Sequence, residues 1–197
     1  MTDEKSSKDI LIEVASRLFR LRGYYGVGLN DIIEESGIPK GSLYYYFPGG
    51  KEELAIEAIH YSKRIVMNDI QESLGQTEDP VRALQAHLYQ LSKIFGGGES
   101  SQGLSFAAIA GEKHSTSEAI RLACQSAFQS WQSIYAEKLL VAGFNEQQAE
   151  DLSITVHALI EGGILLAVTE KSGRPLQVIA EQIPLLISFS GVQTPAE

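Results

Sequence analysis

Residues 28–48 read GLNDIIEESGIPKGSLYYYFP, and this stretch decides the fold of the amino-terminal third. Apolar Leu29 and Ile32 mark one short helix, and Leu43 and Phe47, four residues apart, mark a second. The SGIP tetrapeptide between them ends the first helix with a glycine cap and starts a turn. The spacing therefore predicts a helix-turn-helix.

Helical spacing of apolar residues continues on both sides of this stretch. Strands with alternating polarity are not apparent, so we expect an all-α chain of about nine helices. The further helices are expected before Gly23 and over residues 51–74, 80–95, 104–110, 117–142, 146–170 and 176–189. Pro184 lies inside the last helix and should kink it. The PGG run at 48–50 predicts a boundary between residues 1–50, a three-helix domain, and residues 51–197, a larger helical bundle.

Composition excludes several classes of protein. The chain has 197 residues, of which 44% are hydrophobic, so a substantial core is possible. A single cysteine, Cys124, excludes a disulfide framework and every multi-cysteine metal site, and we expect it to be a small buried hydrophobe. We find no run of about 20 apolar residues and no secretory signal, so we expect a cytoplasmic protein without membrane contact.

The formal net charge of −9 hides an uneven distribution. Residues 1–64 carry nine Lys or Arg and ten Asp or Glu, whereas residues 65–197 carry seven and fifteen. Bulk charge therefore does not indicate nucleic-acid binding, and any site for DNA should lie in the first third.

The solvent side of the second short helix has the residue types of a DNA-reading surface. Burial of Leu43 and Phe47 leaves Lys40, Ser42, Tyr45 and Tyr46 facing outward, and Gly41 adds almost no bulk. A recognition helix reads base edges with its first residues, and its free N–H groups favour phosphate. The same shape also occurs inside ordinary helical bundles, where the tyrosines would be a solvent-facing aromatic cluster.

Residues 28–48, followed by GKEELAIEA at 50–58, resemble the signature of TetR-family transcriptional repressors, most closely the LmrA/YxaF-like subgroup. IEGGI at 160–164 and IAEQIP at 179–184 are also similar to that subgroup, so the resemblance spans residues 9–187. It implies a homodimer whose two recognition helices enter successive major grooves of a near-palindromic operator. The DNA-binding residues it implies are Asn30, Lys40, Gly41, Ser42, Tyr44, Tyr45, Tyr46 and Lys51.

The resemblance also implies roles for these residues. Lys40, Gly41 and Ser42 would face bases, Tyr44 and Lys51 would hold phosphates, and Tyr45 and Tyr46 would contact the backbone or a thymine methyl. The chain departs from the family pattern twice. Gly28 stands where Ser or Thr is usual, and Tyr46 stands where His is common, so the operator sequence cannot be predicted.

The larger bundle is expected to hold a small-molecule effector, because the resemblance implies such a pocket. Aromatic and polar residues at helical spacing would line it, although such stripes are more often plain core. The candidates are His87, Leu91, Phe95, Phe106, Phe128, Trp131, Tyr135, His157 and Glu161. His157 and Glu161 alone lack the further ligands that a metal needs, and we expect neither a metal nor a cofactor.

The last two helices are expected to form the dimer interface, again by resemblance. The Gly162-Gly163 pair suits close helix approach, either across a two-fold axis or inside the protomer. The interface candidates are Leu152, Val156, Leu159, Gly163, Leu166, Ile179, Ile183 and Ile187.

These patterns together predict a ligand-responsive repressor that a small, largely apolar or aromatic inducer releases from DNA. An activator of the same fold and a helical interaction module that binds no DNA remain the alternatives. An enzyme is not expected, because the phosphate-loop, dinucleotide-binding and nucleophile-elbow patterns all fail.

Overall fold

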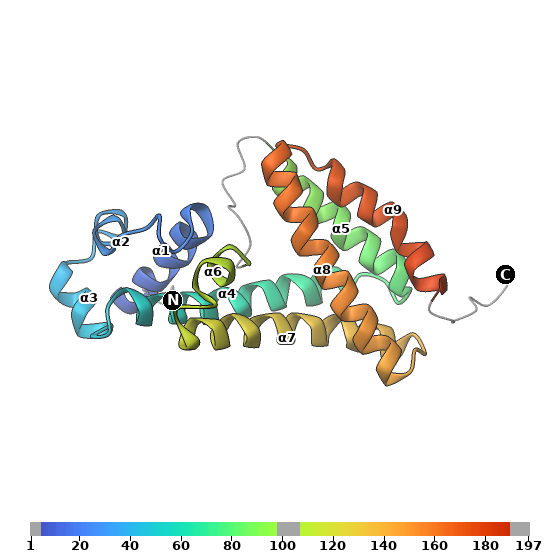
Figure 1. Cartoon of the computed structure of the whole chain (residues 1–197), viewed down its shortest axis with the longest axis horizontal. Helices are drawn as coiled ribbons and strands as arrows, with labels where there is room; N and C mark the ends of the chain where they lie inside the picture. The colour runs from blue at the N-terminus through green and yellow to red at the C-terminus, as the bar shows by residue number, and fades with distance from the viewer. Residues whose placement is uncertain (1–4, 98–106, 190–197) are drawn as a thin grey trace. The chain divides into compact units, whose positions relative to one another are not determined.

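The computed structural model describes residues 5–97 and 107–189, and within these ranges the chain forms nine helices and no strand (Figure 1). The helices are α1 (Ser7–Arg22), α2 (Leu29–Ser36), α3 (Lys40–Tyr46), α4 (Lys51–Leu74), α5 (Pro80–Gly96), α6 (Ala107–Lys113), α7 (Glu118–Val141), α8 (Glu146–Glu170) and α9 (Arg174–Phe189). The all-α class that the spacing predicted is therefore confirmed.

The described residues fall into two compact units. The first unit holds residues 5–65 and 107–127, and the second holds residues 66–97 and 128–189. Helices α4 and α7 are each continuous from one unit into the other. In the first unit α6 occupies Ala107–Lys113 instead of the expected 104–110, and residues 104–106 lie outside the described ranges.

Helix α1 is the brace of the first unit, and it packs against α2, α3 and α6. Its first turn is capped by Ser6, whose hydroxyl accepts a hydrogen bond from the Asp9 N–H at 3.2 Å. Its buried face carries fully enclosed apolar side chains, and the shared core of the unit includes Leu11, Ala15, Phe19, Ile32, Leu43, Phe47 and Leu54.

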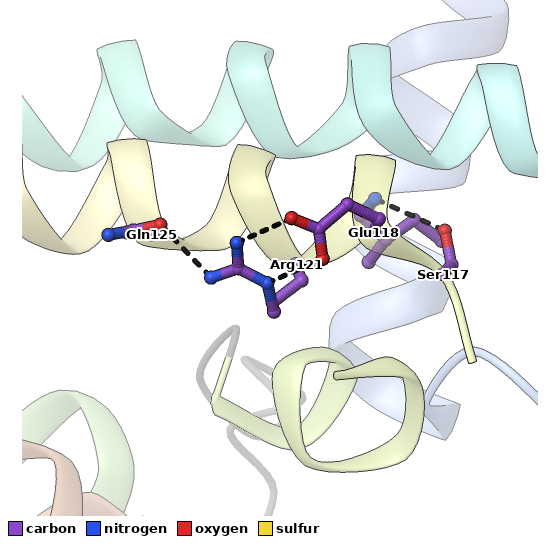
Figure 2. A network of polar contacts seen from close by, with 5 residues as sticks. Ser117, Glu118, Arg121 and Gln125 are labelled. Carbon is purple, nitrogen blue, oxygen red and sulfur yellow. Dashed lines mark hydrogen bonds and ion pairs between the residues drawn. The ribbon is translucent and has the colours of Figure 1, made fainter. Parts of the chain in front are cut away.

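The beginning of α7 is joined to α4 through a serine. The Ser117 hydroxyl accepts a hydrogen bond from the Ile120 N–H at 3.2 Å and donates one to Glu52 at 2.5 Å. Figure 2 shows the cap beside the exposed cluster in which Arg121 bonds Glu118 and Gln125. Ser117 therefore satisfies one free N–H of α7 and also fixes the first turn of α4.

In the second unit α5 packs against α9 and α8, and α8 packs against α9. Two glycine contacts permit this close packing. A Cβ atom on Gly96 would lie 2.3 Å from the backbone nitrogen of Gly173, and one on Gly163 would lie 2.7 Å from the ends of Leu176 and Ile179. Gly163 thus serves a crossing inside the protomer, one of the two uses that its sequence context allows.

The expected proline lies inside α9 and has a specific consequence for hydrogen bonding. Pro184 has no N–H, so the Ala180 carbonyl four residues earlier loses its usual helical donor. The Gln85 side-chain amide of α5 donates to that carbonyl at 3.0 Å. The vacant acceptor is thereby used to tie α5 to α9.

Helix α8 is the most apolar long helix in the described part of the chain. By length and composition alone it could cross a membrane, and 44% of its most apolar window is buried. A core helix of a soluble protein has the same character, because one face of α8 packs against α5 and α9. Its exposed residues include four large apolar side chains, Ile154, Leu159, Leu165 and Leu166.

Candidate functional site

The helix-turn-helix forms as the spacing predicted. Helix α2 ends at Gly37, whose φ of 67° lies in the left-handed region and whose N–H donates to the Ile33 carbonyl at 3.0 Å. Pro39 then precedes the first turn of α3, where its fixed φ suits a helix start. The turn is therefore set by a glycine and a proline two residues apart.

Helix α3 buries one side and exposes the other. Leu43 and the adjacent Phe47 are at most 1% exposed, and they anchor the helix to the core of the first unit. Side chains predicted to meet DNA lie on the outer face: Lys40, Gly41, Tyr44 and Tyr45 are exposed, whereas Ser42 and Tyr46 are half-buried. Tyr45 is 80% exposed, and its ring meets that of Tyr46 edge-on at 5.1 Å.

The start of α2 shows how the chain manages without a capping hydroxyl. Gly28 offers no side chain, and its backbone N–H instead donates to the Asp31 carboxylate at 2.6 Å. Asp31 also lies 3.8 Å from Arg22 at the end of α1. Asn30, which precedes Asp31 on α2, is exposed.

Lys51 opens α4 and is half-buried rather than free on the surface. Its Nζ atom lies 4.2 Å from the centre of the Tyr24 ring. Burial lowers the pKa of the Lys51 ammonium, the carboxylate of Glu112 opposes this shift, and the charge of Lys113 adds to it. Tyr24, Glu112 and Lys113 were not among the predicted site residues, because they are remote from Lys51 in sequence.

The second unit brings together most of the predicted effector-site residues. Nε2 of His87 on α5 lies 3.1 Å from the Tyr135 hydroxyl of α7, and both side chains are buried. Burial lowers the pKa of His87 to about 4, so its imidazole is neutral at pH 7. Burial, and secondarily the charge of Glu161, raises the pKa of the Tyr135 phenol.

His157 on α8 is the second polar centre of this cluster. Its Nδ1 atom lies 3.1 Å from the Gln132 amide, and its ring packs against those of Phe128 at 5.3 Å and Trp131 at 5.8 Å. Its Nε2 lies 3.4 Å from Glu161, without the alignment of a hydrogen bond. Nδ1 of His87 and Nε2 of His157 are both buried without a hydrogen-bond partner in the described structure.

The other predicted effector-site residues are placed less centrally. Leu91 and Phe95 are half-buried towards the end of α5, and Phe106 lies outside the described residues. Cys124 is buried, and burial raises the pKa of its thiol to about 11. Within residues 5–97 and 107–189, His, Cys, Asp and Glu side chains do not gather in groups of three or more that could hold a metal ion.

The predicted dimer residues divide between the interior and the surface. Leu159 and Leu166 are exposed on α8, and Ile179 is half-buried on α9. Five others pack inside the protomer: Leu152, Val156, Gly163, Ile183 and Ile187. The exposed apolar residues on these helices that sequence analysis did not name are Ile154, Leu165, Val178 and Leu185.

A groove of about 380 Å³ lies within this exposed apolar face. Its lining is almost entirely apolar and comes from both helices: Leu159, Val178, Ile179, Gln182, Ile183, Leu185 and Leu186. We call the exposed residues Leu159, Leu165, Leu166, Val178 and Leu185 the α8–α9 face.

A helix-turn-helix followed by a larger helical bundle is the architecture of one class of transcriptional regulator. A family model described as "Bacterial regulatory proteins, tetR family" matches residues 11–58. A second model, "Transcriptional regulator LmrA/YxaF-like, C-terminal domain", matches residues 80–182. The chain belongs to the TetR family of helix-turn-helix transcriptional regulators, with an LmrA/YxaF-like carboxy-terminal domain, and it is not an enzyme.

Individual relatives agree over nearly the whole chain. It is 44% identical to the uncharacterized regulator YxaF of Bacillus subtilis strain 168, covering 97% of this chain and all of YxaF. It is 46% identical to LmrA of the same strain, covering 92% of this chain and 96% of LmrA. The crystal structure of the reduced form of E. coli NemR is 21% identical, with a TM-score of 0.83 over 97% of this chain and 99% of NemR, and it supports the fold.

Proposed function

We propose that this regulator is a cytoplasmic homodimeric repressor that binds a near-palindromic operator and is released by a small, largely apolar or aromatic effector. The observation that carries DNA binding is the outer face of α3. Lys40 and Tyr45 are exposed there, while Leu43 and Phe47 hold the helix from behind. That arrangement leaves cation, backbone and aromatic groups free to enter a major groove.

The α8–α9 face supports the dimer. Exposed Leu159, Val178 and Leu185 line one apolar groove, and a soluble protein rarely leaves a contiguous apolar patch of this kind in water. A two-fold axis pairs a patch with its own copy, so one self-complementary face is sufficient. The exposed part of α8 would then be buried against the partner instead of in a lipid bilayer.

The cluster around His87 and His157 supports an effector site. Two buried nitrogen atoms lack a hydrogen-bond partner there, and leaving a buried polar atom without one costs about 1–3 kcal/mol. A ligand with hydrogen-bonding groups and an apolar or aromatic body would satisfy both the nitrogens and the rings of Phe128 and Trp131. An effector that binds more tightly to a conformation with separated recognition helices would lower the affinity for DNA. The loss of DNA affinity cannot exceed the ratio of the effector's affinities for the two conformations.

The test is a titration of the full-length protein with a labelled duplex taken from the DNA immediately upstream of its own gene. We expect the protein to bind this duplex, and we expect the logarithm of its affinity to fall linearly with the logarithm of the salt concentration. The interaction-module alternative predicts no retention at any ionic strength. A promoter–reporter fusion separates repressor from activator, since deletion of the gene should raise expression for a repressor and lower it for an activator.

A further inference from the structure

The ring of Tyr24 carries two lysine ammonium groups from different helices. Lys51 of α4 lies 4.2 Å from the ring centre, and Lys113 of α6 lies 4.8 Å from it. Tyr24 itself is 8% exposed and stacks on Phe19 of α1, with ring centres 5.8 Å apart and an interplanar angle of 13°. The ring is therefore a fixed platform, and an ammonium near a tyrosine face is held by the ring quadrupole.

Helix α6 holds the loop that carries this ring. The Glu112 carboxylate accepts a hydrogen bond from the Tyr25 backbone N–H at 2.9 Å. On the other side, a Cβ atom at Gly23 would lie 2.1 Å from the same carboxylate, and the φ of 71° at Gly23 also favours glycine. Lys113 lies 5.4 Å from the Tyr25 ring as well as against Tyr24. Two consecutive residues of α6 thus clamp residues 23–25.

Opposite charges meet in this cluster. Two ammonium groups approach one ring, and the carboxylates of Glu112 and, more weakly, Asp31 act on Lys51 in the opposite sense to Lys113. The carboxylates and the ring therefore offset the mutual repulsion of the two lysines. The position of Lys51 therefore depends on α1, through Phe19 and Tyr24, and on α6, through Glu112 and Lys113.

We propose that Tyr24, clamped by Glu112 and Lys113 of α6, is the positioning residue that presents the Lys51 ammonium to a DNA phosphate. A free lysine loses side-chain entropy when it binds a phosphate, and a lysine already confined by a ring loses less. This role rests on the DNA-binding function proposed above, and in particular on Lys51 as a phosphate contact.

A double-mutant cycle tests the role of the ring. Affinity for the upstream duplex is measured by fluorescence anisotropy for wild type, Lys51→Ala, Tyr24→Leu and the double variant. Lys51→Ala should reduce the salt slope by about one. Tyr24→Leu should weaken binding about threefold to tenfold in wild type and leave Lys51→Ala unchanged, while Tyr24→Phe should restore most of the affinity.

The cycle separates positioning from damage to the fold. A merely structural defect from Tyr24→Leu would weaken binding equally in both backgrounds and would overturn the proposal. Additive effects, or an unchanged salt slope in Lys51→Ala, would do the same while the wild type still binds DNA. Failure of the wild type to bind would instead overturn the proposed function itself.

A matched pair of carboxylate variants tests the α6 clamp. Glu112→Ala and Glu118→Ala each remove one negative charge from the first unit, but Glu118 is exposed and pairs with Arg121 (Figure 2). At about 0.15 M salt, where distant exposed charges are screened, Glu112→Ala should bind the duplex at least threefold more weakly than Glu118→Ala. Equal affinities of the two variants would remove α6 from the proposal.

Discussion

The imidazole of His87 and the phenol of Tyr135 lie 3.1 Å apart inside the second unit, and both side chains are buried. This pair joins α5 to α7 through polar groups in an otherwise apolar interior. Since burial lowers the pKa of His87 from 6.5 to about 4, the imidazole of this pair is neutral at physiological pH.

Stability should consequently fall on acidification. Between pH 6.5 and pH 4 the unfolded chain binds a proton at His87 that the folded chain refuses, so stability is present above this window and is lost as the pH falls through it. The expected loss from this residue is about 2 kcal/mol between pH 7.5 and pH 5. Urea unfolding at both pH values should show a smaller pH dependence for His87→Gln than for wild type. His114→Gln, at an exposed site, is the control and should behave as wild type. Identical pH dependence in all three proteins would contradict the buried neutral state.

Lys40 should contribute specificity. Lys40→Ala removes an exposed cation at the start of α3, and we expect about a tenfold or greater loss of affinity for the upstream duplex. Affinity for an arbitrary duplex should change much less, because base contacts carry sequence information and phosphate contacts do not. Lys93→Ala removes an exposed lysine from α5 and should leave both affinities unchanged. Equal losses on the two duplexes would place Lys40 among the phosphate contacts.

The α8–α9 face should control the oligomeric state. Leu185→Glu places a charge in the groove of that face, and burying an unpaired charge in an interface is costly. Sedimentation equilibrium at micromolar concentration should give a dimer for wild type and a monomer for this variant. Leu140→Glu alters another exposed leucine, on α7, and should remain dimeric. A wild-type monomer would exclude the proposed interface.

Gly96 should be intolerant of any side chain. Its Cβ would lie 2.3 Å from backbone rather than from a flexible side chain, so Gly96→Ala should destabilise the protein by about 2 kcal/mol or more. Gly111→Ala is a suitable control because its Cβ would meet nothing within 4 Å. The higher helix propensity of alanine should make Gly111→Ala stabilise α6 by roughly 0.5–1 kcal/mol. The midpoints of chemical unfolding of the two variants should therefore shift in opposite directions from that of wild type. A shift of both midpoints in the same direction would contradict the close approach of α5 to Gly173.

The sequence predicted those features that depend on local spacing. Helix boundaries, the glycine cap at Gly37 and the outer face of α3 follow from periodicity and turn chemistry within a few residues. Sequence analysis could select both His87 and Tyr135, because each residue lies on the inner face of a long helix. Effector binding by these residues remains a prediction.

Features that depend on how distant segments meet were not predictable. The clamp of Glu112 on the loop at residues 23–25 joins groups almost 90 residues apart, and α6 itself is too short for a clear periodic signal. Nor could spacing separate the inner from the outer apolar face of α8, where Val156 is buried and Leu166 is exposed. A helix that is apolar on several sides gives no periodic contrast.

The bond from Gln85 to the carbonyl freed by Pro184 fixes the axial alignment of two helices. If α9 slid along α5 by a single turn, the amide and the carbonyl would part, and a buried oxygen would be left without a donor. Pro184 therefore fixes the position along α5 of the leucines that α9 exposes, because it frees the carbonyl that Gln85 binds.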